Sequence, residues 1–476
     1  MLHRTLLVMQ VFVLYALSGC VRGYDPHLTE RPMPSELHAD THAEGELEPL
    51  KVDATVITRA TDATEVRAVS IAEVVKTAMD QPTSVLEAAA RLEAASGRVQ
   101  TNDGKLLPGL SADYRVRYLR GREVGSFGEL QPDVNFARYE PTAAFFYRNN
   151  PGAAGTGSKA ERRFADAAGY DLREAQRQAM LQAGLSYQDI ALTRASMAIA
   201  AQLVHDAQRF YDIANARAVA EVASGADVAR AEAALAQARR VEIQARAFWK
   251  AASIRLAQLL RWDLGEMLTT EDAEIGLQPV VDDASEANLT SEAGRARPDV
   301  QAAQMRAEGG TLRTKQGFWD LLGPEVEEII GGRFVGTQMS SLGTTLIGYA
   351  FIGLSFDFEK GGRIRTAKAN AKALQVRAEA TYEQAAADIQ TAMVSVEAAR
   401  EAIPPAQDEV AAAERSYAIE LARFEAGTGT GLEVIQSQNM KARAQLAFIE
   451  QVLKFNAAQI ELAAAIGHLT PELFAP

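Results

Sequence analysis

A seven-residue apolar repeat constrains the fold of this chain more than any other feature. A repeat of this period, continued through many heptads, is typical of a helix that supercoils against its neighbours. After a glycine-rich segment, a second pattern begins at Leu432 and continues to Ile460. The sequence therefore predicts a very long α-hairpin with a glycine tip. The repeat positions of its first arm are Tyr382, Ile389, Val396, Ile403, Val410, Tyr417 and Phe424.

The same unit occurs twice in the chain. When Tyr211 is placed on Tyr417 without a gap, Arg217 falls on Arg423 and the apolar seam of the first half falls on that of the second. Such a match predicts two structural repeats. The first-half helix, predicted over 159–222, carries two apolar stripes, which predicts neighbours on both of its sides. The stripes are Ile190, Met197, Val204 and Tyr211, and Leu185, Leu192, Ile199 and Ile213.

Charge and cysteine content exclude several classes of function. The 476 residues carry a formal charge of −13, which argues against a nucleic-acid partner. The single cysteine, Cys20, excludes an internal disulfide and a thiolate metal cage. His38 and His42 are four apart, but they lie in a polar linker and are read as solvated. With no nucleophile–base set and no phosphate loop, we predict no catalysis, no cofactor and no metal site.

The N-terminus has the features of a lipoprotein signal. A short basic start precedes an apolar run that ends at Leu17-Ser18-Gly19-Cys20, which is similar to the lipobox of bacterial lipoproteins. That resemblance implies a signal peptide over 1–19 and lipidation of Cys20. The alternative is an ordinary cleaved signal with an incidental cysteine. In such lipoproteins an aspartate after the cysteine tends to mean retention in the inner membrane. Here Val21 follows the cysteine, so the resemblance favours the outer membrane.

The remaining boundaries follow composition and periodicity. We expect an acylated periplasmic strap of little structure over 20–69, a first repeat over 70–262, an acidic irregular linker over 263–294, a second repeat over 295–468 and a tail over 469–476. Each repeat begins with a shorter helix. Two strand candidates follow in each repeat: 110–118 and 142–148, joined by a loop over 121–138, and then 326–337 and 346–358. Their apolar–polar alternation suits either a solvated sheet or a membrane sheet.

These features together resemble the TolC-type outer-membrane efflux proteins. The resemblance covers about 70–468 and is carried by the duplicated helix–strand–strand–helix–helix order and by two motifs. One is Arg297-Pro298-Asp299-Val300, which opens the second repeat, and the other is the tip segment from Arg423 to Val434. The family implies a mainly α protein with long coiled-coil hairpins and four strands per chain. Three chains would close a twelve-stranded barrel.

The resemblance also implies partners and sites. An outer-membrane, lipid-anchored homotrimer would extend into the periplasm and meet an adaptor protein and an inner-membrane pump at the hairpin tips. Asp227 and Glu433 would surround the periplasmic aperture, although both also suit helix capping. The tips would dock the adaptor, or their glycines would only allow the turn. The tip residues are Ala223, Ser224, Gly225, Ala226, Gly427, Thr428, Gly429, Thr430 and Gly431.

Two functions remain at this point. The first is a passive exit channel of a tripartite efflux pump or a type I secretion system. The second is a lipid-anchored structural or adhesive trimer without transport activity. Paired strands between long helices favour the channel, and the sequence does not name its substrate.

Overall fold

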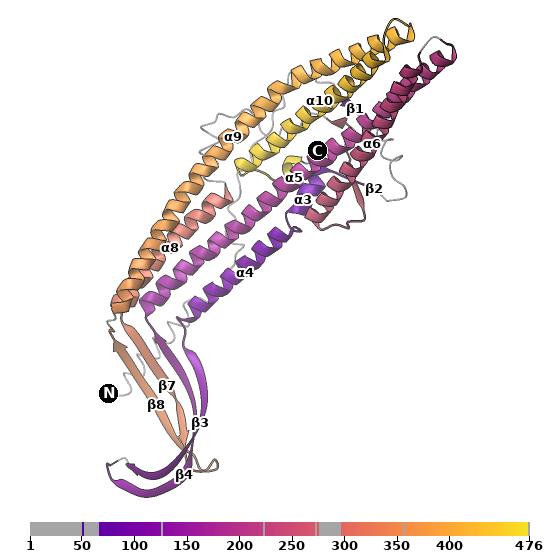
Figure 1. Cartoon of the computed structure of the whole chain (residues 1–476). Helices are drawn as coiled ribbons and strands as arrows, with labels where there is room; N and C mark the ends of the chain where they lie inside the picture. Colours follow the sequence, from indigo (N-terminus) through magenta and orange to yellow (C-terminus); the bar gives the residue numbers. More distant parts are fainter. Residues whose placement is uncertain are drawn as a thin grey trace. The chain divides into compact units, whose positions relative to one another are not determined.

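The computed structural model describes residues 50–51, 66–124, 127–221, 224–271, 274–275, 297–355 and 358–474. Within this part of the chain, each repeat contributes a shorter helix, two strands and a long helical hairpin (Figure 1). The mainly helical fold with a separate β part confirms the predicted fold class. Signal residues 1–19, Cys20 and most of the predicted strap lie outside the described residues.

The first repeat begins with α3 (Ile71–Ala78), which Ser70 caps: its hydroxyl accepts a hydrogen bond from the Glu73 N–H at 3.3 Å. Then follow α4 (Thr83–Gly104), β3 (Gly109–Val124) and β4 (Leu130–Asn149). The hairpin consists of α5 (Pro151–Val219) and α6 (Gly225–Leu260).

The second repeat has the same order: α8 (Pro298–Leu322), β7 (Glu325–Val335), β8 (Gly343–Gly353), α9 (Phe358–Glu425) and α10 (Gly431–Ala465). The helix α9 continues through Pro404 and Pro405. A short 3-10 helix, η2 (Pro471–Phe474), follows.

Several predicted boundaries are wrong. Most of the loop predicted over 121–138 is strand, because β3 and β4 continue their antiparallel ladder past a register shift between Gly121 and Glu123. A glycine at such a bulge can adopt positive φ, and Gly121 does so at 118°. The helix α5 begins at Pro151, earlier than predicted, because Asn150 caps it: its side-chain oxygen accepts a hydrogen bond from the Ala153 N–H at 3.0 Å.

The predicted linker and strap both contain strands. β5 (Met267–Thr270) pairs in parallel with β2 (Val66–Val69), and β6 (Glu274–Ile275) pairs with β1 (Leu50–Lys51). These short pairs satisfy backbone groups that composition alone assigned to irregular chain. All four residues of β5 are buried, and the Leu268 backbone carbonyl accepts a hydrogen bond from the indole N–H of Trp249 at 3.0 Å.

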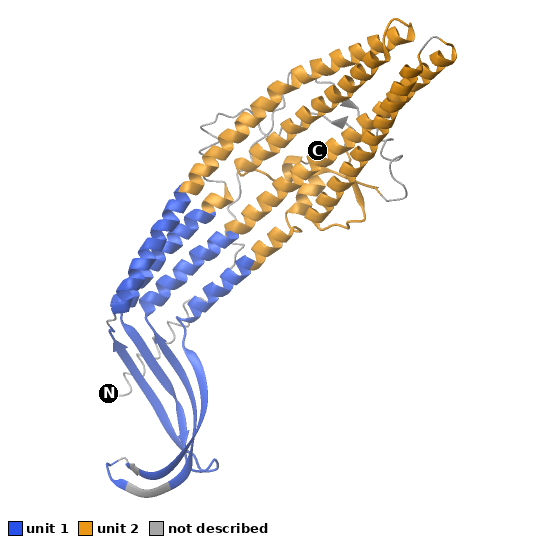
Figure 2. Ribbon diagram, viewed as in Figure 1, with its two compact units in different colours: residues 1–31, 91–169, 302–379 blue, residues 32–90, 170–301, 380–476 orange. Residues whose placement is uncertain are grey.

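The chain forms two compact units, and each takes residues from both repeats (Figure 2). Among described residues, the first unit holds 91–124, 127–169, 302–355 and 358–379, and therefore all four strands of the large sheet. The second unit holds the hairpin tips and the largest apolar core, around Trp249, Ile190 and Leu256.

Over part of α5, the two stripes pack in different apolar clusters of the second unit. Ile190 packs in the core with Trp249 and Leu256 of α6, whereas Ala191 and Ala195 pack with Ile449 of α10, next to Leu192. The prediction of neighbours on two sides is confirmed. The α9 seam is buried from Ile389 to Phe424, apart from a half-buried Val396, but Tyr382 is 44% exposed.

Candidate functional site: the hairpin tips and the four-stranded sheet

The second tip is a closely hydrogen-bonded turn. Gly427 has a φ of 83°, and its N–H donates to the Phe424 carbonyl at 3.0 Å, while the Thr428 N–H donates to the Arg423 carbonyl at 2.9 Å. This pair of bonds is a Schellman motif, in which a glycine in the left-handed region ends the helix. Gly429 is also confined, because an added Cβ would lie 3.0 Å from the Phe424 nitrogen.

Thr430 and Glu433 form a capping box at the start of α10. The Glu433 N–H donates to the Thr430 hydroxyl at 3.4 Å, and the Thr430 N–H donates to the Glu433 carboxylate at 2.8 Å. The backbone N–H and the hydroxyl of Thr430 both bind the carboxylate and hold the pKa of Glu433 below its ordinary value. The predicted capping role of Glu433 is therefore present in the structure.

The first tip has different chemistry at equivalent positions. Glu221 occupies the place of Gly427 and has a φ of 60°, a conformation that costs a residue with a Cβ more than glycine. The Ser224 hydroxyl donates to the Asp227 carboxylate at 2.9 Å, and Arg230 lies 3.2 Å from the same group. The shorter aspartate forms no capping box here. Ala223 lies outside the described residues.

The two tips contact each other through α5 and α9. The Arg217 guanidinium donates to the Phe424 carbonyl and lies 4.8 Å from the centre of its ring. The Phe210 and Phe424 rings are 5.1 Å apart, and both side chains are buried. Gly431 fits against this pair, because a Cβ there would lie 3.1 Å from Phe210 and 3.6 Å from the Asp227 carboxylate. The structure thus brings Asp227 next to the second tip.

Sequence reasoning missed Arg217 and Phe210 as contacts between tips. The repeat alignment could have indicated Arg217, since its counterpart Arg423 forms an ion pair with Glu420 on its own helix. Equivalent arginines of the two repeats thus have different partners, and this difference points to a contact of Arg217 with the other tip. Phe210 has no such signal, because its counterpart is Ser416.

A buried ion pair joins the hairpins farther from the tips. The Lys441 ammonium of α10 lies 3.0 Å from the Asp206 carboxylate of α5 and 4.9 Å from the Tyr417 ring centre. Burial, and then the charge of Asp206, raise the pKa of Tyr417 to about 12. Asp206 interrupts one apolar stripe of α5, and Lys441 is the partner that makes this interruption tolerable.

The sheet of the first unit has the strand order β3-β4-β7-β8, with every neighbouring pair antiparallel. Cross-strand partners share a face, so the register assigns each side chain to one of two faces. One face is apolar and exposed. It carries Leu110, Tyr114, Val116, Tyr118, Tyr139, Phe145, Ile330, Phe334, Leu346 and Ile352. The opposite face carries most of the charges.

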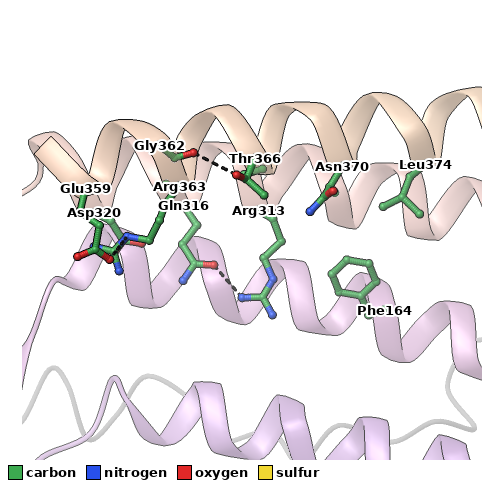
Figure 3. Close-up of a pocket in the computed structure, with 13 residues that line it drawn as sticks. Phe164, Arg313, Gln316, Asp320, Glu359, Gly362, Arg363, Thr366, Asn370 and Leu374 are labelled. Carbon is green, nitrogen blue, oxygen red and sulfur yellow. Dashed lines mark hydrogen bonds and ion pairs between the residues drawn. The ribbon is translucent and has the colours of Figure 1, made fainter.

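A groove of about 740 Å³ lies between α8, α9 and α5 in the first unit (Figure 3). Asp320, Glu359 and Arg363 lie at one end, and Phe164 and Leu374 at the other. Burial raises the pKa of Asp320 and lowers that of Arg313. The groove mixes both signs of charge, and Arg313 is already bound to Glu161, so the lining favours no single ligand.

The described residues contain neither a membrane-spanning helix nor a cluster of metal ligands. None of their helices has a sufficiently long apolar stretch to cross a bilayer. No three His, Cys, Asp or Glu side chains of this part of the chain are grouped as metal ligands.

Comparisons with known proteins agree with the fold. The family model described as "Outer membrane efflux protein" matches residues 336–468, which cover β8, α9 and α10. This stretch of the chain is similar to that family. The predicted resemblance to TolC-type outer-membrane efflux proteins is thereby confirmed. No curated protein sequence matches the chain.

Solved outer-membrane channels share the architecture at low identity. The outer-membrane channel OprN is 17% identical, with a TM-score of 0.71 over 90% of this chain and 98% of that one. CmeC of Campylobacter jejuni is 16% identical, with a TM-score of 0.73 over 90% and 93%. The open-state MtrE channel of Neisseria gonorrhoeae is 16% identical, with a TM-score of 0.69 over 89% and 95%. Family and fold together support an outer-membrane exit channel for efflux.

Proposed function

We propose that this chain is one subunit of a homotrimeric exit channel that carries cargo from the periplasm through the outer membrane. One observation carries the proposal: the sheet has an apolar, exposed face, and among the described residues no strand pairs with the outer edge of β3 or of β8. Unpaired strand edges cannot face lipid, so further copies must close the sheet. The number of copies, three with twelve strands in all, is taken from the resemblance to TolC-type proteins.

Reconstitution in planar bilayers tests the channel. We expect the purified oligomer to insert and to give discrete conductance steps. The competing function, a structural or adhesive trimer, predicts stable oligomers that insert without conductance. An inserted oligomer that never conducts, even after the tips are loosened by Arg217→Ala, would exclude the channel.

We also propose a lipid anchor at Cys20, supported by the lone cysteine at the end of an apolar signal. A single acyl chain binds membranes weakly, whereas several anchor a protein stably. We expect mass spectrometry of the mature protein to find an acylated Cys20 at its N-terminus. A mature protein that starts elsewhere, or carries an unmodified cysteine, would contradict the anchor.

The hairpin tips are proposed to dock a periplasmic adaptor, which would connect the channel to an inner-membrane pump. The exposed turn at Thr428 supports this, since its side chain is free of the apolar cluster below. Thr428→Trp leaves the turn glycines and the Thr430 cap in place, so we expect it to reduce adaptor crosslinking and efflux while the trimer stays folded. Thr430 is a poor test position, because it caps α10.

Asp227 and Glu433 are proposed to form acidic rings at the periplasmic aperture, three copies of each. Rings of carboxylates favour cations. Capping alone predicts that Glu433→Gln leaves ion selectivity unchanged, whereas an aperture role predicts weaker block by multivalent cations. Single-channel recordings of the Glu433→Gln, Asp227→Asn double variant separate the two, and unchanged selectivity and block would leave capping as their role.

A further inference from the structure

The charged face of the sheet carries an unexpected excess of arginine. Three successive rows of cross-strand partners form this region, which we name the arginine band. The rows pair Asp113 with Thr142 and Thr142 with Arg333, then Arg115 with Glu140, then Arg117 with Arg138. The arginine band thus contains Arg115, Arg117, Arg138 and Arg333, with Asp113 and Glu140 as its acids. Four guanidinium groups against two carboxylates leave a charge of +2 in one chain.

Only part of this charge is neutralised within the sheet. The Glu140 carboxylate is buried, and it lies 3.0 Å from Arg138 and 4.0 Å from Arg117. Arg115 and Arg333 have no hydrogen-bond or ion-pair partner in the described part of the chain, and the Nε atom of Arg333 is buried without one. Two arginines therefore remain available to a ligand.

The positive charge of the arginine band is opposite in sign to the net charge of the whole protein. The chain has a net charge of −13, so a positive region does not follow from its average composition. The face opposite the band carries the exposed apolar side chains, such as Val116 and Leu346. If the apolar face meets lipid, as the proposed channel requires, the arginine band faces the lumen, where water keeps its charges hydrated.

We propose that the arginine band is an anion-binding ring inside the channel, which takes carboxylate- or phosphate-bearing solutes. This inference rests on the proposed function. The planar guanidinium group binds carboxylates and phosphates with two parallel hydrogen bonds, and rings of Arg or Lys are used by anion pores. Three copies in a trimer would bring six net positive charges to one level of the barrel.

Block of the channel by a small polyanion tests the ring. Citrate added on the sheet side of reconstituted trimers should reduce the single-channel current at low millimolar concentration or below. The Arg115→Gln, Arg333→Gln double variant removes both unpaired arginines and leaves the Glu140 cluster intact, so the band becomes neutral. We expect about a tenfold higher half-blocking concentration, and a reversal potential shifted toward cations.

Arg120→Gln is the matched control. Arg120 lies on the same strand as Arg115, but the register places it on the apolar face, so its loss should leave citrate block unchanged. Inorganic triphosphate as a second probe shows whether phosphate is bound as well as carboxylate. Conducting trimers whose double variant is blocked by both anions as strongly as the wild type would overturn the ring. Oligomers that never conduct would instead count against the channel itself.

Discussion

At the tips, the backbone conformation of a single position can require glycine there. Gly427 adopts positive φ, and a Cβ there would also lie 3.3 Å from the Arg217 guanidinium. We expect Gly427→Ala to destabilise the folded protein by about 1 kcal/mol, because a Cβ is disfavoured in the left-handed region. Thermal unfolding followed by circular dichroism measures the change.

Gly97 provides the opposite case. It lies in α4, is exposed, and has open space where a Cβ would be. Gly97→Ala should therefore stabilise the protein by about 0.5–1 kcal/mol, since glycine is a poor residue in a helix interior. If both alanine variants shift the melting temperature in the same direction, the conformational explanation of Gly427 is wrong.

At the scale of the element, a buried arginine fixes where three helices meet. Arg297, at the start of α8, is 4% exposed, lies 2.7 Å from Asp299 and 2.9 Å from Asp388 of α9, and donates to the Ala465 carbonyl at the end of α10. Burial opposes the charge of Asp299, but the hydrogen bonds and charge of Arg297 outweigh it and hold the pKa of Asp299 below its ordinary value. This contact explains the Arg-Pro-Asp opening of the second repeat.

Removal of this arginine should be costly. We expect Arg297→Met to destabilise the protein by about 3 kcal/mol, because it leaves carboxylates without their partner. Because the pKa of Asp299 is lower in the folded than in the unfolded protein, its ionisation stabilises the folded state at pH values above the unfolded pKa of about 3.9. This stabilisation is lost as the pH falls through the folded pKa. The wild type should therefore lose more stability than Arg297→Met between pH 5 and about 2. Arg423→Met, which breaks a partly exposed pair within one helix, should cost less than about 1 kcal/mol.

Elements that depend on a local sequence pattern are predicted correctly. Contacts between residues that are far apart in the sequence are not. The heptads of α9 are visible in the chain, and their burial from Ile389 to Phe424 follows. In the sequence, Asp206 only interrupts an apolar stripe. Its partner Lys441 lies 235 positions away, so the ion pair cannot be predicted from the local pattern. The outer parts of β3 and β4 lack strong alternation and form through their mutual ladder. The capping box at Glu433 was predictable, whereas the contact between Arg217 and Phe424 depends on how two hairpins pack.

At the scale of the whole molecule, the strand order gives a direct test of assembly. β3 and β8 are at opposite edges of one four-stranded sheet, with β4 and β7 between them. A disulfide between these edge strands should therefore join two chains. Cysteine pairs placed along the two edges, such as Ser111→Cys with Thr345→Cys, should oxidise where the strands of neighbouring subunits align.

The number of chains then appears as a ladder on a denaturing gel. We expect crosslinked species that end at three chains, because closure of the ring leaves no free edge. The control pair, Ala143→Cys with Gly332→Cys, joins Cα partners of β4 and β7 within one chain and should give monomers only. A ladder that ends at two chains, or continues past three, would contradict the trimer. An edge pair that yields only monomers at every register would mean that the sheet does not close between copies.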